Sequence, residues 1–191
     1  MKRIAVLALT ALLASCASSP ASRFYSLTAA APAAAALPEA PGPAEPLRVA
    51  AVHIPLALDR EEIVRLGPGN QLDIDDLNRW GAPLDEMVQR ALTEDLRERL
   101  PAGQVVLPSS PAPAGTDRIV VDILQFQSDT AGTVVFDGSW SLLPPDKSAP
   151  SLIRDIHYSE TASPGDYGDQ AAAMSKMLGR LADDIVRSLP H

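Results

Sequence analysis

Apolar and polar residues alternate along three consecutive stretches in the second half of the chain, residues 118–127, 133–143 and 151–160. Successive side chains of a strand point to opposite faces of a sheet, so this period of two is typical of half-buried strands. In the second stretch one face carries four apolar side chains, Val134, Phe136, Trp140 and Leu142. Turn residues separate the stretches, which predicts an antiparallel meander with one buried face.

Two other stretches have a period of three to four residues, which predicts amphipathic helices. The first extends from Leu84 to Leu100 and follows Pro83, a residue that suits the first turn of a helix. Its apolar stripe consists of Leu84, Met87, Val88, Ala91, Leu92, Leu96 and Leu100. The second helix begins at about Asp169 and carries a similar stripe to Leu189.

Shorter apolar runs predict the remaining strands. Residues 47–54 form a Val- and Ala-rich run, and residues 104–107 form a short one. Residues 58–66 and 71–74 flank Gly67-Pro68-Gly69-Asn70, whose residue types favour a hairpin turn. The sequence therefore predicts the α+β class, with a single mixed or antiparallel β-sheet and two helices packed on one face.

The N-terminus has the parts of an export signal. Lys2 and Arg3 precede an apolar run that ends at Leu13, which is about half as long as a helix that crosses a bilayer. The stretch Leu13-Ala14-Ser15-Cys16 resembles the bacterial lipobox, and Cys16 is the only cysteine of the chain. The resemblance implies cleavage after residue 15 and acylation of Cys16. The alternatives are an ordinary signal peptide with an unrelated cysteine, or a buried structural cysteine.

The residue after the cysteine indicates the membrane. By resemblance to the bacterial sorting rule, Ala17 in place of aspartate implies the periplasmic face of the outer membrane. We divide the chain into a signal peptide (1–15), a lipidated N-terminus with an Ala/Pro-rich tether (16–46), and an α+β domain (47–191). Phe24, Tyr25 and Leu27 are either linker residues or a short strand that docks on the domain, and we favour the strand.

Charge narrows the classes of partner. The chain has a formal net charge of −8, and removal of Lys2 and Arg3 with the signal peptide changes it to −10. Nucleic acid is not expected as a partner of so acidic a protein. With one cysteine, no disulfide forms within the chain, so the core alone must hold the fold.

Candidate chemistry is sparse. The three histidines lack the i, i+4 spacing of a helical zinc site, and no nucleophile elbow or phosphate-binding loop is present. The stretch from Asp73 to Asn78 begins like a calcium loop but fails at Leu77, which leaves a solvated acidic segment as the better interpretation. We predict no catalytic residue, no metal and no cofactor, and therefore no enzyme.

Several short motifs together resemble the ABC-type transport auxiliary lipoproteins, the PqiC or YmbA-like family. In chain order they are the lipobox, Phe24-Tyr25-Ser26-Leu27, Val52-His53-Ile54-Pro55, Leu58-Asp59-Arg60, Ile63-Val64-Arg65, and Asn78-Arg79-Trp80 before Pro83-Leu84. The resemblance implies a non-enzymatic subunit of a phospholipid transport system of the mammalian-cell-entry (MCE) type. Its partners would be an MCE tunnel protein with an inner-membrane permease and ATPase. An envelope scaffold or assembly adaptor without a role in lipid movement is the alternative.

The stretch from Leu58 to Trp80 is the candidate contact surface. Arg60, Arg65, Arg79 and Trp80 are residue types that anchor protein interfaces. Because a tunnel is symmetric, we expect a cyclic homo-oligomer. The alternatives are that the arginines balance neighbouring acidic residues on a monomer, and that Trp80 is a plug of the core, which we favour for that residue.

Overall fold

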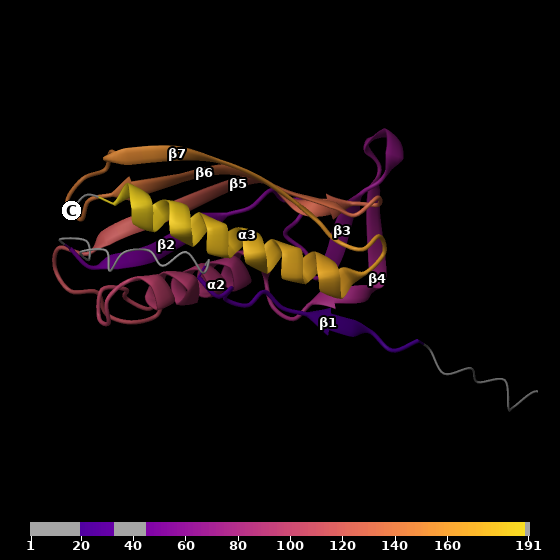
Figure 1. The fold of residues 1–191 in the computed structure, drawn as a ribbon, viewed down its shortest axis with the longest axis horizontal. Coiled ribbons are helices and arrows are strands. Elements are labelled where there is room, and N and C mark those ends of the chain that lie inside the picture. The colour runs from indigo at the N-terminus through magenta and orange to yellow at the C-terminus, as the bar shows by residue number, and fades with distance from the viewer. Residues whose placement is uncertain (1–19, 33–44, 190–191) are drawn as a thin grey trace, which may run out of the picture.

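The computed structural model describes residues 20–32 and 45–189 (Figure 1). This part of the chain forms one open sheet of seven strands with two helices, which confirms the predicted α+β class. The strands are β1 (Arg23–Tyr25), β2 (Leu47–His53), β3 (Glu62–Leu66), β4 (Leu72–Trp80), β5 (Asp117–Asp129), β6 (Thr133–Leu143) and β7 (Leu152–Thr161). The helices are α2 (Leu84–Arg99) and α3 (Tyr167–Ser188), and a short 3-10 turn, η1, covers Pro68–Asn70.

The sheet is mixed, in the order β1-β4-β3-β5-β6-β7, and β2 also pairs with β5. β5, β6 and β7 form the predicted antiparallel meander. The long strand β5 has two parallel neighbours on one side, because β2 pairs with its first half and β3 with its last residues. The β3–β4 hairpin forms around the predicted turn and extends the sheet at one end of the molecule (Figure 1).

Both helices pack against the sheet and against each other, lying across one of its faces (Figure 1). The Asp166 side chain caps α3 by accepting hydrogen bonds from the backbone N–H groups of Gly168 and Asp169. Phe136 and Trp140 from the meander and Leu92 from α2 are almost completely buried between these layers. No helix of the described residues is long and apolar enough to span a bilayer.

Two elements differ from the sequence-based expectation. Residues 104–107 do not form a strand, and a single bridge joins Val105 to Leu47. β4 is longer than predicted, because it continues through the acidic stretch to Trp80. A local pattern does not reveal this continuation, since the acidic side chains find their partners on β3 and α3, which are distant in sequence.

The predicted docking strand is confirmed. β1 pairs in parallel with the end of β4, and Tyr25 lies opposite Trp80 in the register. After β1 the chain continues along the domain, where the side chain of Leu27 is only 1% exposed. The packed part of the protein therefore begins well before Leu47.

Candidate interaction surface

A hydrogen-bond chain links three elements at the end of the molecule where β1 and β4 meet the start of α3 (Figure 1). The Tyr25 hydroxyl donates to Asn78 Oδ1 over 2.9 Å, and Asn78 Nδ2 donates to Asp75 Oδ2 over 2.9 Å. The Tyr167 hydroxyl donates to the same carboxylate oxygen over 3.1 Å. Through these contacts, β1, β4 and α3 are fixed to one another.

The Asp75 carboxylate is the centre of this chain. The backbone N–H of Leu77 donates to its Oδ1 over 2.8 Å, and this bond, with those from Asn78 and Tyr167, lowers the pKa of Asp75. Burial raises the pKa of the Tyr167 hydroxyl to about 12, and the nearby Asp75 charge adds to that shift. The acidic stretch that we interpreted as a solvated segment is thus part of a strand, with Asp75 held by hydrogen bonds.

Arg65 on β3 lies against the same group of residues. Its guanidinium pairs with Asp73 over 2.5 Å and stands 4.6 Å from the centre of the Tyr167 ring. The Arg65 side chain is only 16% exposed. An arginine held by a carboxylate and an aromatic face is committed to contacts within this chain.

Arg60 and Arg79 lie closer to solvent. Arg60 Nε donates to Glu62 Oε2 over 2.9 Å, which is the main reason that the pKa of Glu62 is lowered. Arg79 donates to Glu61 Oε2 over 3.1 Å and to the backbone oxygen of Asp76 over 3.0 Å. All three candidate arginines therefore have acidic partners within the chain, as the charge-balance alternative expects. Exposed pairs of this kind contribute little to stability and exchange readily.

Trp80 has a position in the core. Its side chain is 5% exposed and belongs to the main cluster of buried apolar residues, which supports the plug interpretation. Trp80 also lies at an open hollow of about 390 Å³. Its lining consists of Phe24, Asp59, Arg60, Glu61, Trp80, Gly81, Ala82 and Pro83. The structure thus brings Arg60 and Trp80 to one hollow, and Arg65 lies apart from it against Tyr167.

Phe24 is an exposed residue that was not among the predicted interface residues. Its side chain is 67% exposed beside the Trp80 hollow, while the side chain of Tyr25 points to the interior. The adjacent aromatic pair was a usable signal, because neighbouring side chains of a strand face opposite sides. Once the strand was predicted, one of the two rings had to face away from the domain.

The histidines do not form a catalytic group with the nearby serine. On the open face of the sheet, His53 pairs with Asp122 over 2.7 Å and His157 pairs with Asp137 over 2.8 Å. The register places Asp122 between His53 on β2 and Ser139 on β6. Acyl transfer needs the imidazole between the serine and the aspartate, so this row has the wrong order. In residues 20–32 and 45–189, no three His, Cys, Asp or Glu side chains are grouped as a metal site.

The described domain has an α+β fold, and a lipobox-like stretch precedes it in the sequence. The model of the ABC-type transport auxiliary lipoprotein component family matches residues 25–186, which is most of the chain. The protein therefore belongs to this family. The match begins at Tyr25, the last residue of β1, and ends at Val186, in the last turn of α3.

Solved structures have the same fold. A protein whose crystal structure carries no functional description aligns with a TM-score of 0.71 at 22% identity, over 88% of this chain and 98% of that one. A Xanthomonas campestris protein of the DUF330 family aligns with a TM-score of 0.66 at 19% identity, over 86% of this chain and 92% of that one. Comparison with curated proteins gives no match.

Proposed function

We propose that this protein is the outer-membrane-anchored, periplasmic lipoprotein of an MCE-type ABC transport system for phospholipids. In this role, acylated Cys16, which lies outside the described residues, holds the domain at the membrane, and the domain docks the tunnel protein without catalysing a reaction. The observation that carries the proposal is membership of the transport auxiliary family over residues 25–186. The acidic charge and the lipobox-like stretch agree with it.

The docking role includes a cyclic homo-oligomer that matches the symmetry of a tunnel. Of the four candidate interface residues, Arg60 and Arg79 are the best suited to a partner, because their side chains are 39% and 32% exposed, against 16% for Arg65. A carboxylate of a neighbouring subunit can replace Glu61 or Glu62 with little loss. Trp80 would support the floor of the contact.

Co-isolation from membranes tests the docking role. The lipidated protein is isolated in mild detergent from cells that also produce the MCE protein, permease and ATPase, and the mass of the complex is measured. We expect a ring with the MCE protein bound. Isolation of the lipoprotein with other envelope proteins, and without the MCE protein, would favour the scaffold alternative.

A charge reversal tests the surface. Arg79→Glu should place three acidic side chains together beside the Trp80 hollow and reduce ring assembly at least tenfold, because like charges repel across an interface. Arg180→Glu is the matched control. Arg180 lies on α3, is half-exposed, and pairs with Glu160 of β7. Normal assembly of a folded Arg79→Glu protein would show that the interface lies elsewhere.

A further inference from the structure

The chain after β1 is fastened to both helices. The backbone N–H of Thr28 donates to Ser175 Oγ over 3.2 Å, and that of Ala30 donates to Asp95 Oδ1 over 2.9 Å. Arg99 Nη2 donates to the carbonyl of Ala30 over 3.3 Å. At Gly179 of α3, a Cβ atom would lie 2.9 Å from the Cβ of Ala30, so a glycine is needed for this close approach.

The far end of the Ala/Pro-rich stretch is also fixed. The backbone N–H of Asp117 donates to the carbonyl of Pro46 over 2.8 Å, and β2 begins at the next residue. The chain is therefore attached to the domain on both sides of residues 33–44. Whatever their conformation, they add nothing to the distance between the domain and an anchor at Cys16.

The anchor path is consequently short. Cys16 and Arg23, the first residue of β1, are seven residues apart, and a fully extended chain of this length spans about 25 Å. If the domain began at Leu47, the path would contain 31 residues and reach about 100 Å. The fastening of residues 23–30 thus reduces the possible reach about fourfold.

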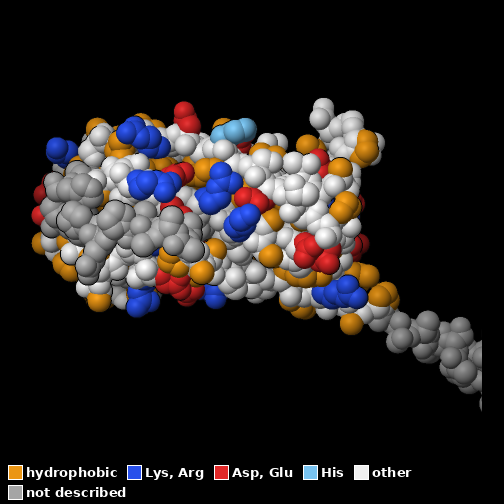
Figure 2. All heavy atoms as spheres, viewed as in Figure 1, with side chains coloured by type: hydrophobic (Ala, Val, Ile, Leu, Met, Phe, Trp, Pro, Cys, Tyr) orange, Lys and Arg blue, Asp and Glu red, His pale blue; other side chains and the backbone are white. Residues whose placement is uncertain are grey.

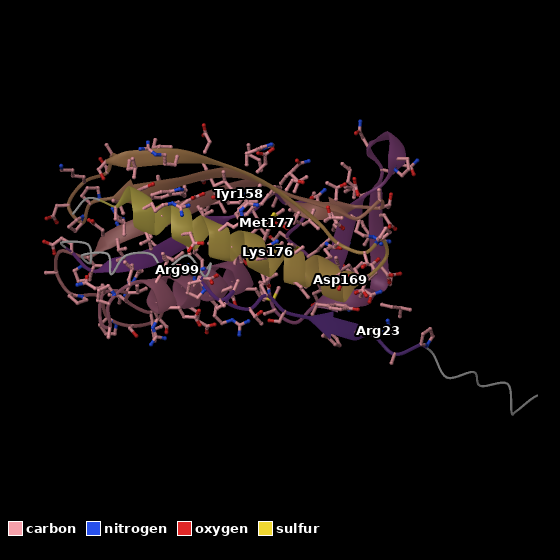
Figure 3. All side chains as sticks on the ribbon, viewed as in Figure 1. Arg23, Arg99, Tyr158, Asp169, Lys176 and Met177 are labelled. Carbon is pink, nitrogen blue, oxygen red and sulfur yellow. The ribbon has the colours of Figure 1, made fainter. Side chains whose placement is uncertain are left out.

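The surface at the start of β1 has the residue types of a lipid contact. Phe24 is 67% exposed, and Leu77, which is 38% exposed, precedes the residue that pairs with Arg23. Arg23 itself is exposed and forms no ion pair with any described residue. In Figure 2, apolar side chains gather around a basic one at the lower right, where Figure 3 labels Arg23.

We propose that the β1 end of the domain, with Phe24, Leu77 and Arg23, lies on the lipid surface that holds the acyl anchor. This inference rests on the acylation of Cys16 in the proposed function. Apolar side chains enter the headgroup region and an arginine pairs with phosphate, so the three residues complement a phospholipid surface. The tunnel protein must then come to the membrane, because the domain cannot extend away from it.

A fluorescent label reports the orientation. The acylated Cys16 leaves no free thiol, so Phe24→Cys and, as a control, Ile153→Cys each provide one labelling site on the lipidated full chain. Ile153 is 57% exposed near the start of β7, at the opposite end of the sheet from β1 (Figure 1). In phosphatidylethanolamine and phosphatidylglycerol vesicles with a quencher on the lipid, we expect several-fold stronger quenching at residue 24.

Two insertions of equal length separate this inference from a long tether. A flexible Gly/Ser segment of about 20 residues, which spans about 25 Å, is placed after Ser19 or after Ala36. The label for this test is on Leu77→Cys, because Leu77 on β4 follows both insertion points in the chain. If the anchor is short, only the insertion after Ser19 reduces quenching at residue 77. Equal reductions by both insertions would show that residues 16–46 act as one tether, and would overturn the inference.

Three further outcomes assign a failure to its cause. Protein that does not float with the vesicles shows that Cys16 does not anchor it, which overturns the acylation and this inference together. Protein that floats but is quenched equally at residues 24 and 153 overturns only the orientation. In the last assay, a water-soluble reagent is added that reacts with the thiol at residue 24. If this thiol is still protected after detergent has dissolved the membrane, a protein copy covers this end instead of lipid.

Discussion

Two aspartates hold the N-terminal segment on the domain, and their pKa values are shifted in opposite directions. Asp75, at the β1 end, is partly exposed and its pKa is lowered, because the N–H of Leu77 and two side chains donate to it. Asp95, on α2, has no exposed surface, and burial raises its pKa to about 6. The hydrogen bond from Ala30 and the ion pair with Arg99 oppose this rise without cancelling it.

The difference shows what each contact does for the protein. The folded protein is more stable when Asp75 is ionised, since its hydrogen-bond donors favour the charged form and solvent reaches it. Asp95 is held in an apolar layer, where Oδ2 has no hydrogen-bond partner among the described residues. The contacts of Asp95 with Ala30 and Arg99 therefore hold the segment inside the domain, and we call them the buried lock. The Asp75 network lies at the surface, where partners or lipid can reach it.

The largest expected effect comes from breaking the lock. Arg99 is 1% exposed and contacts Asp95 over 3.1 Å and Asp183 over 2.6 Å. Arg99→Ala leaves two buried carboxylates without their cation, so we expect a loss of about 3–5 kcal/mol in the free energy of unfolding. Urea denaturation at neutral pH measures this loss.

A surface variant is the control for the lock. Arg60→Ala removes an exposed pair with Glu62 and should change the stability little. The loss in Arg99→Ala should also shrink at acidic pH, because protonation removes the uncompensated charges. Similar small losses of unfolding free energy in Arg99→Ala and Arg60→Ala would contradict the distinction between buried and surface contacts.

A second, smaller effect follows from the raised pKa of Asp95. Its folded value of about 6 lies above the ordinary value of 3.8, so the folded protein binds more protons than the unfolded chain between these values. The contribution of Asp95 to stability therefore falls as the pH rises from about 4 to about 6. Asp95→Asn removes this titration, and wild type should lose stability relative to the variant over that range.

The quantity to measure is the difference in the free energy of unfolding between wild type and Asp95→Asn. The carboxyl groups of Asp75, Asp129 and Glu160 have lowered pKa values, so they make the whole protein more stable as the pH rises. These contributions cancel when wild type and Asp95→Asn are compared by urea denaturation at each pH. A difference that does not depend on pH would show that Asp95 is not protonated near pH 6.

The comparison also explains which parts of the structure could be predicted from the sequence. The meander and both helices follow from local periodicity, since one buried face repeats every two or every three to four residues. The fastening of residues 28–30 does not, because the donors and acceptors come from α2 and α3, up to 147 positions away. The available signal was the charged pair Asp95 and Arg99, which lies beside the apolar stripe of α2. Charged side chains that are buried require partners, so this pair indicated further contacts there.

The candidate surface was predicted in part. Residue types identified Arg60, Arg65, Arg79 and Trp80, but exposure separates them, since Trp80 is in the core and Arg65 is held against Tyr167. Phe24 shows the reverse case, because alternation in the predicted strand required one ring of the Phe24-Tyr25 pair to face away from the domain but did not indicate which one. Only the pairing of β1 with β4 determines that its ring faces outward.

The smallest expected effect concerns the Asp75 network. Tyr167→Phe keeps the ring that packs against Arg65 and Tyr25 but removes the hydroxyl that donates to Asp75. We expect a loss of about 1 kcal/mol in the free energy of unfolding, because Asp75 keeps its donors from Leu77 and Asn78 and solvent reaches it. Tyr25→Phe is the matched control, since its hydroxyl donates to a neutral amide oxygen, and it should lose less. A loss in Tyr167→Phe as large as that in Arg99→Ala would mean that the surface network is as rigid a lock as the buried one.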